Sequence, residues 1–124
     1  MPEAPLPRLS PNHAEMLVLS VLAEGPSYGY AITKAIDLGS EGSFAMGAAK
    51  LYPLLARLDK QGLVTTTWEE VKARDSDDET NGRRRKWYTL SPKGERRLEQ
   101  HVQAHRRFTA LIDAFLPPLE ARPA

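Results

Sequence analysis

Four consecutive basic residues followed by an aromatic pair form the segment of this sequence with the clearest capacity to bind a ligand. The bases are Arg83, Arg84, Arg85 and Lys86, and the pair is Trp87-Tyr88. Four acids precede them, at Asp75, Asp77, Asp78 and Glu79, and Asn81-Gly82 separates the two groups. A segment divided by charge in this way is usually a solvated loop. Guanidinium and ammonium groups also bind phosphate oxygens, so a nucleic-acid backbone is the alternative partner.

Histidines are the other side chains that could do chemistry near neutral pH. His101 and His105 are four residues apart and would share one face of a helix, the spacing that lets two imidazoles hold a metal ion. No carboxylate lies at the next turn of that face, so packing or a pH-sensitive contact between subunits is the simpler explanation. No glycine-rich elbow or phosphate loop lies near a histidine, and there is no cysteine. We therefore expect no enzyme activity, no metal and no cofactor.

Length and composition are those of one globular domain. The chain has 124 residues, of which 41% are hydrophobic and 27% are charged. The net charge of +1 carries little information, because the charges are segregated along the chain. No apolar run approaches the roughly 20 residues of a membrane span, and the N-terminus lacks the apolar core of a secretory signal. We expect a cytoplasmic protein with no membrane partner.

Helix signals divide the first half of the sequence. Three prolines make residues 1–9 a flexible arm, and Ser10-Pro11 provides a capping oxygen and a proline for the first helical position. That helix is expected to end at Gly25. Ser27 is expected to cap a second helix, and a glycine-rich turn precedes a third helix over residues 48–62. Leucines at i, i+3, i+4 and i+7 give the third helix one apolar face, formed by Leu51, Leu54, Leu55 and Leu58. Pro53 must lie near the first turn of that helix or distort it.

The pattern after Gly62 changes to that of strands. Residues 63–71 and 86–90 are rich in β-branched and aromatic side chains, which predicts a hairpin with a long charged loop. Ser91-Pro92 then starts a last helix that continues to Leu116. At 1.5 Å per residue this helix is about 35 Å long, more than a small domain needs for its own core. We expect its far half to pack on another chain, through Val102, Phe108, Leu111, Ile112, Phe115 and Leu116.

The order of these elements is that of a winged helix-turn-helix, a mainly α fold with a two-stranded β-wing and, here, a long C-terminal dimerisation helix. In such folds the recognition helix enters the DNA major groove and the wing touches the backbone. The expected DNA-binding domain spans residues 10–90, the dimerisation helix residues 91–116, and a tail residues 117–124. This placement puts the basic run where phosphate contacts are made.

Three segments at a consistent spacing resemble the PadR family, named for the phenolic acid decarboxylase repressor. They are LAEGPSYGYAI, KLYPLLARLDKQGLV and GRRRKWYTLSPKG, and the similarity extends from Met16 to Leu116. The resemblance implies a regulator of transcription, usually a repressor, that is dimeric through its C-terminal helix. It also implies that a small aromatic effector could release the DNA, as happens in some members.

The resemblance also matches individual residues of this chain to positions of the family's motifs. Gly29 and Tyr30 match the GY of the second helix, and the segment 51–53 matches the LYP of the recognition helix. Residues 82–86 match the GRRRK of the wing; Tyr88 matches its buried aromatic and Gly94 the KG of the last helix. Two departures stand out. Many relatives have Gly-Thr or Ser-Thr before LYP, whereas this chain has Ala49-Lys50, and its acidic run lengthens the wing.

The sequence thus predicts a set of DNA contacts: Tyr30, Lys50, Tyr52, Arg83, Arg84, Arg85 and Lys86. Lys50 would read a base edge, and Tyr52 would contact the backbone. The tyrosines at 28, 30 and 52 could equally be core residues. If an effector exists, its pocket would lie between the long helix and the core, with aromatic surface from Trp87, Phe108 and Phe115.

Two questions stay open at this level. One is whether the chain binds operator DNA or is a winged-helix module that binds only protein; a basic wing favours DNA. The other is the role of the acids at 75–79, which could form a solvated tip, restrain non-specific DNA binding, or contact a basic surface of the partner subunit.

Overall fold

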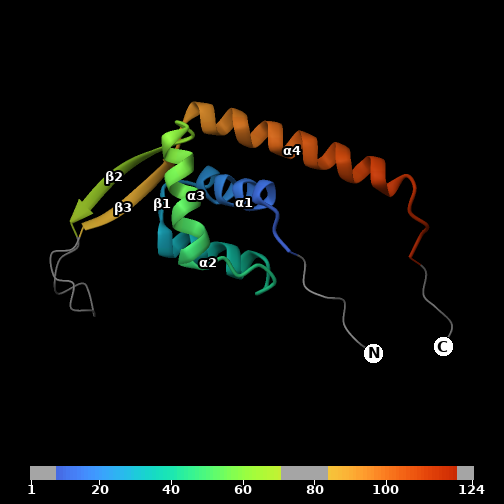
Figure 1. Ribbon diagram of the computed structural model, residues 1–124, viewed down its shortest axis with the longest axis horizontal. Helices are drawn as coiled ribbons and strands as arrows, with labels where there is room; N and C mark the ends of the chain where they lie inside the picture. The colour runs from blue at the N-terminus through green and yellow to red at the C-terminus, as the bar shows by residue number, and fades with distance from the viewer. Residues whose placement is uncertain (1–7, 71–83, 120–124) are drawn as a thin grey trace.

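Four helices and a small sheet make up the part of the chain that the computed structural model describes, residues 8–70 and 84–119. The helices are α1 (Pro11–Ala23), α2 (Gly29–Gly39), α3 (Ala48–Lys60) and α4 (Pro92–Asp113). The strands are β1 (Ser27–Tyr28), β2 (Val64–Glu70) and β3 (Arg84–Leu90), as Figure 1 shows. This order confirms the predicted winged helix-turn-helix. None of the described helices is long and apolar enough to cross a membrane.

Both predicted serine-proline helix starts are present. The Ser10 hydroxyl accepts a hydrogen bond from the His13 amide at 3.1 Å, and the Ser91 hydroxyl accepts one from the Gly94 amide at 3.0 Å. In each case the serine oxygen satisfies an amide that has no partner within the helix. The predicted capping role of Ser27 is wrong: Tyr28 precedes α2 without a capping side chain, and Ser27 lies in β1.

The sheet has three antiparallel strands in the order β1-β3-β2, one strand more than predicted. The additional strand is only two residues long and pairs Ser27 with Tyr88 and Tyr28 with Trp87. Gly25, two residues after the end of α1, has a φ of 144° that a residue with a side chain rarely adopts, and this glycine allows the chain to turn from α1 into β1. The chain then runs extended beside β3 before α2 begins.

The recognition-helix candidate α3 continues through Pro53. The proline ring is exposed, and the helix loses one backbone hydrogen bond there without ending. All four predicted core leucines of α3 are buried. With residues of α1, α2 and the base of the sheet they form one hydrophobic cluster, which includes Val18, Leu19, Leu22, Ile32, Ile36, Met46, Leu63, Val64 and Tyr88.

The start of α4 is fastened to the turn between α3 and β2. The Ser91 hydroxyl donates to the Gly62 carbonyl at 2.7 Å, and the Ser91 amide donates to the Leu63 carbonyl at 3.1 Å. A Cβ atom at Gly94 would collide with that same Leu63 carbonyl, so the helix approaches closely only because residue 94 is glycine. From this point α4 runs along α1, and the C-terminal end of α4, red in Figure 1, extends beyond α1.

Candidate nucleic-acid interface

The outer side of α3 carries the residues predicted to meet DNA. With the leucines turned inward, Lys50 is exposed and the Tyr52 side chain is 49% exposed. Tyr30, on α2, is exposed as well. All three are therefore available to a ligand, and none of them is a core residue.

Tyr52 is held in place by its contact with α2. Its phenol ring lies against Gly29, and a Cβ atom at residue 29 would overlap the Tyr52 hydroxyl. The glycine of the GY pair is therefore required for the close approach of α2 and α3. Tyr52 thus packs against Gly29 with part of its ring and remains about half exposed. A tyrosine in this position can pack against the protein and still offer its hydroxyl group to a ligand.

One face of the β2–β3 hairpin, which we call the wing, is turned toward α3. Tyr88 lies on this face and is buried. Burial raises the pKa of the Tyr88 hydroxyl, and Tyr52 and Asp59 on α3 contribute to the same direction. Tyr88 is buried in the same hydrophobic core as the α3 leucines. Because residues two apart on a strand share a face, this placement identifies the wing side chains that lie on the α3 side.

Arg84 and Lys86 are on the α3 side of the wing. Arg84 lies four residues and Lys86 two residues before Tyr88, and Trp68 lies directly opposite Lys86 in the strand register. The Arg84 guanidinium is 4.6 Å and the Lys86 ammonium 5.5 Å from the centre of the Trp68 ring. Cation–π contacts of this kind contribute about 0.5–1 kcal/mol each at exposed sites. Trp68 thus contacts two of the four basic side chains and stabilises them on the α3 side of the wing.

Arg85 points to the opposite face. Its guanidinium lies over the Tyr28 ring at 4.3 Å, and that ring meets Trp87 edge to face with 5.0 Å between centroids. The Trp87 indole nitrogen donates to Glu69 at 2.8 Å. Tyr28 is thereby a packing residue of the sheet, and the basic run is divided between two faces. Arg83 and the acids 75–79 lie outside the described residues.

The far half of α4 and the turn that follows it present most of the predicted dimerisation residues to solvent. The predicted helix end at Leu116 is wrong: α4 ends at Asp113, so Phe115 and Leu116 lie just beyond it. Phe108 is 66% exposed and Phe115 87% exposed. Leu111, Ile112 and Leu116 are also exposed, whereas Val102 is half-buried. Five large apolar side chains are thus exposed within residues 108–116, and large exposed apolar patches on soluble proteins are commonly contact sites.

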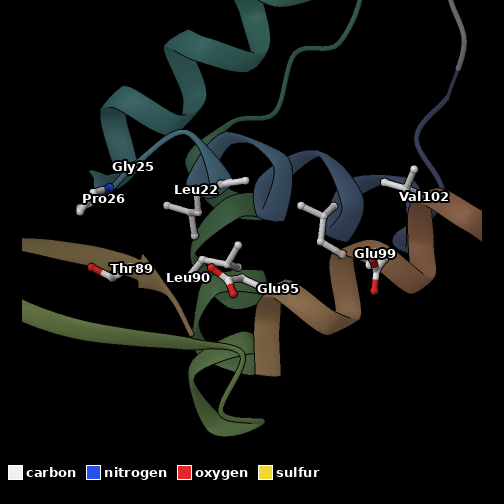
Figure 2. A pocket seen from close by; sticks show the side chains of 10 residues that line it. Leu22, Gly25, Pro26, Thr89, Leu90, Glu95, Glu99 and Val102 are labelled. Carbon is white, nitrogen blue, oxygen red and sulfur yellow. The ribbon is translucent and has the colours of Figure 1, made fainter. Parts of the chain in front are cut away.

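The predicted effector aromatics are not gathered within one chain. A cavity of about 470 Å³ lies between the end of α1, the end of β3 and α4, with Leu22, Leu90, Leu98 and Val102 on its apolar side. Figure 2 shows Glu95 and Glu99 among its lining residues. Trp87, Phe108 and Phe115 do not line it. Trp87 belongs to the wing, and the two phenylalanines are exposed on and just beyond α4.

The paired histidines of α4 have separate neighbours. His105 meets His13 of α1 edge to face, with ring centroids 5.9 Å apart, and His101 contacts the buried carboxylate of Glu15. Within residues 8–70 and 84–119, no three potential ligand side chains converge on a metal position. Sequence reasoning overlooked Glu15, although an acid within the apolar run of α1 was a visible signal.

Comparison with known proteins agrees with this geometry. Residues 18–100 match the model of the transcriptional regulator PadR-like family. An uncharacterized protein X of Lysinibacillus sphaericus is 27% identical over 109 residues, which cover 88% of this chain and 93% of that protein. The solved structure of a transcriptional regulator from Clostridium thermocellum has a TM-score of 0.71 and 27% identity, and covers 86% of this chain and 95% of its own. The solved structure of a PadR family transcription regulator from Clostridium difficile has a TM-score of 0.63 and 26% identity, and the match covers 83% of this chain and 97% of that protein.

Proposed function

This chain belongs to the PadR-like family of transcriptional regulators, and from that premise we propose that it binds operator DNA as a homodimer and represses transcription. The observation that carries the proposal is the presence of exposed or partly exposed bases on both α3 and the adjoining face of the wing. Arg84 and Lys86 lie on the wing face that adjoins α3, the helix whose outer side carries Lys50. One duplex could therefore meet the helix and the wing together.

Each predicted DNA-contact residue has a role in this proposal. Lys50, in the first turn of α3, donates to guanine O6 or N7 in the major groove. Tyr52 and Tyr30 donate their hydroxyl groups to phosphates. Arg84 and Lys86 neutralise phosphates beside the groove, and Arg83 joins them as a further proposed contact. Arg85, engaged with Tyr28 on the opposite face, contributes less.

The homodimer is proposed to form through the far half of α4 and the turn that follows it. Covering Phe108, Leu111, Ile112, Phe115 and Leu116 removes their apolar surface from water, which is the main driving force for association. A two-fold dimer presents two copies of α3, so the operator should be pseudo-palindromic, with half-sites about one helical turn or more apart.

A small aromatic effector is the last part of the proposal. Phe108 and Phe115 are exposed in a single chain, so an effector site that uses them must be completed by a second chain. Such a ligand would release the operator only if it binds the DNA-incompetent dimer more tightly than the competent one.

Selection from random duplexes tests the proposed function. The purified protein is mixed with a randomised library in the presence of heparin, and bound DNA is sequenced over several rounds. We expect a two-fold symmetric consensus and a retarded band that heparin does not remove. Recovery of random sequence, with no band that survives heparin, would identify the chain as a protein-binding winged helix instead.

A further inference from the structure

One buried carboxylate joins three helices. Glu15 lies in the second turn of α1, and the residue is only 5% exposed. Arg97 and His101 of α4 both contact its Oε2 atom, at 3.0 Å and 2.6 Å. The Arg57 guanidinium of α3 lies 3.8 Å from the other oxygen, Oε1. The helix that carries the proposed dimer surface and the helix that carries Lys50 therefore meet at the same side chain.

The carboxylate is held in its charged form. Burial alone would raise the pKa of Glu15, but hydrogen bonds and positive charge from His101 and Arg97 outweigh burial and hold the pKa below its ordinary value. An ionised carboxylate can only accept, so the His101 Nε2 atom must carry the proton that it shares with Glu15. Among the residues that the structure describes, Arg57, Arg97 and His101 are the charged or titratable groups that face Glu15.

The two contacts from α4 fix the axial position of that helix. Arg97 and His101 are one turn apart and converge on one oxygen atom, so a slide of α4 by a single residue, about 1.5 Å, would disturb both. Ile112 lies eleven residues beyond His101, about 16 Å along the helix. A tilt of about 10° at the Glu15 contact would move Ile112 by about 3 Å, and would change the separation of the two α3 helices in a dimer.

Stability by itself does not require such a cluster. Apolar side chains of similar volume often replace a buried ion pair without loss of stability, whereas charged groups restrict the geometries that two elements can adopt. We propose that Glu15 is a positioning residue for operator binding: by fixing α4 on α1 and reaching α3, it sets the spacing of half-sites that the dimer accepts. This inference rests on the proposed function, because it presupposes a DNA-binding dimer formed through α4.

The experiment compares half-site spacings. Operators selected by the wild-type chain are prepared with the original spacing and with one base pair added or removed, together with a random duplex. Glu15→Gln removes the charge at constant size. A triple variant, Glu15→Leu with Arg97→Met and His101→Leu, fills the same space with apolar groups and tests the inference if Glu15→Gln does not fold. Ser40→Ala is the control, because it removes hydrogen bonds to Ile36 and Phe44 away from the cluster.

We expect the wild type and Ser40→Ala to bind the original spacing about tenfold more tightly than the altered ones. Folded, dimeric Glu15→Gln or the triple variant should lose about tenfold on the original spacing, bind the three operators within about threefold of each other, and keep wild-type affinity for random DNA. A folded variant that keeps the wild-type preference for spacing would overturn the inference and leave the proposed function intact. Failure of the wild type to select any operator would instead overturn the proposed function.

Discussion

The division of the basic run between two wing faces leads to a quantitative prediction about salt. Replacement of Arg84 and Lys86 with alanine removes both cations from the α3 side, whereas Arg85→Ala removes one cation of the same kind from the opposite face. The first variant should bind every DNA sequence more weakly and release fewer counterions. Arg85→Ala should behave nearly as the wild type.

The magnitude follows from the number of phosphates that are neutralised. Each contact contributes about 0.9 to the slope of log K against log salt concentration. Loss of two contacts should therefore reduce the slope by about 1.8, so that between 50 and 200 mM salt the wild type loses about twelvefold more affinity than the double variant. The change should be equal on operator and random DNA, because phosphates carry no sequence information.

Fluorescence anisotropy of a labelled duplex over this salt range gives the slopes. Circular dichroism of each variant establishes that the wing substitutions have not unfolded the domain. If the double variant keeps the wild-type slope, the basic run is only a solvated face. If Arg85→Ala reduces the slope as much per charge as the double variant, the assignment of faces to DNA and to packing is incorrect.

Four further predictions concern the dimer, specificity, packing and pH. Ile112→Glu should give monomers in sedimentation velocity, because a charge would be buried without a partner; an unaltered dimer would exclude this part of α4 from the interface. Lys50→Ala should lose about 1–3 kcal/mol on the operator in binding titrations and keep most affinity for random DNA, while equal losses would indicate a phosphate contact. Gly94→Ala should lower the free energy of unfolding by about 1–3 kcal/mol in urea, because its Cβ atom would collide with the Leu63 carbonyl, and a neutral result would show that α4 can shift. Since the pKa of Glu15 is lowered by folding, its contribution to stability is complete above the ordinary pKa of about 4.3 and is lost as the pH falls through the lower folded value. Urea titrations between about pH 6 and pH 2 should therefore show a weaker pH dependence for Glu15→Gln, and identical pH profiles would contradict this.

Local signals in the sequence were sufficient for most of the helices. Ser10 and Ser91 each cap a helix through an amide only three residues away, so a short segment contains the whole interaction. The spacing of the four leucines of α3 was likewise sufficient to predict which face of that helix is buried. Such features depend on neighbours in the chain, and their prediction needs no knowledge of the tertiary structure.

Features that join distant segments could not be predicted in this way. β1 is a strand only because β3, about sixty residues later, offers it a partner. Glu15 meets Arg97 and His101 across separations of 82 and 86 residues, and its own neighbours in sequence are apolar. The division of the basic run between the two wing faces could be assigned only from the β2–β3 register and from the burial of Tyr88 in the same core as the α3 leucines. An effector site at Phe108 and Phe115 depends on a second chain and stays a prediction.

If the chain is a repressor as proposed, the exposed far half of α4 also affects how a cell could set the level of repression. If only the dimer occupies the operator, its concentration in the dissociating range varies as the square of the total amount of chain. A twofold dilution, such as growth and division produce, would then lower the DNA-binding form about fourfold. A single unpaired helix face would thereby turn a gradual change in protein number into a steeper change in gene output, with no effector involved.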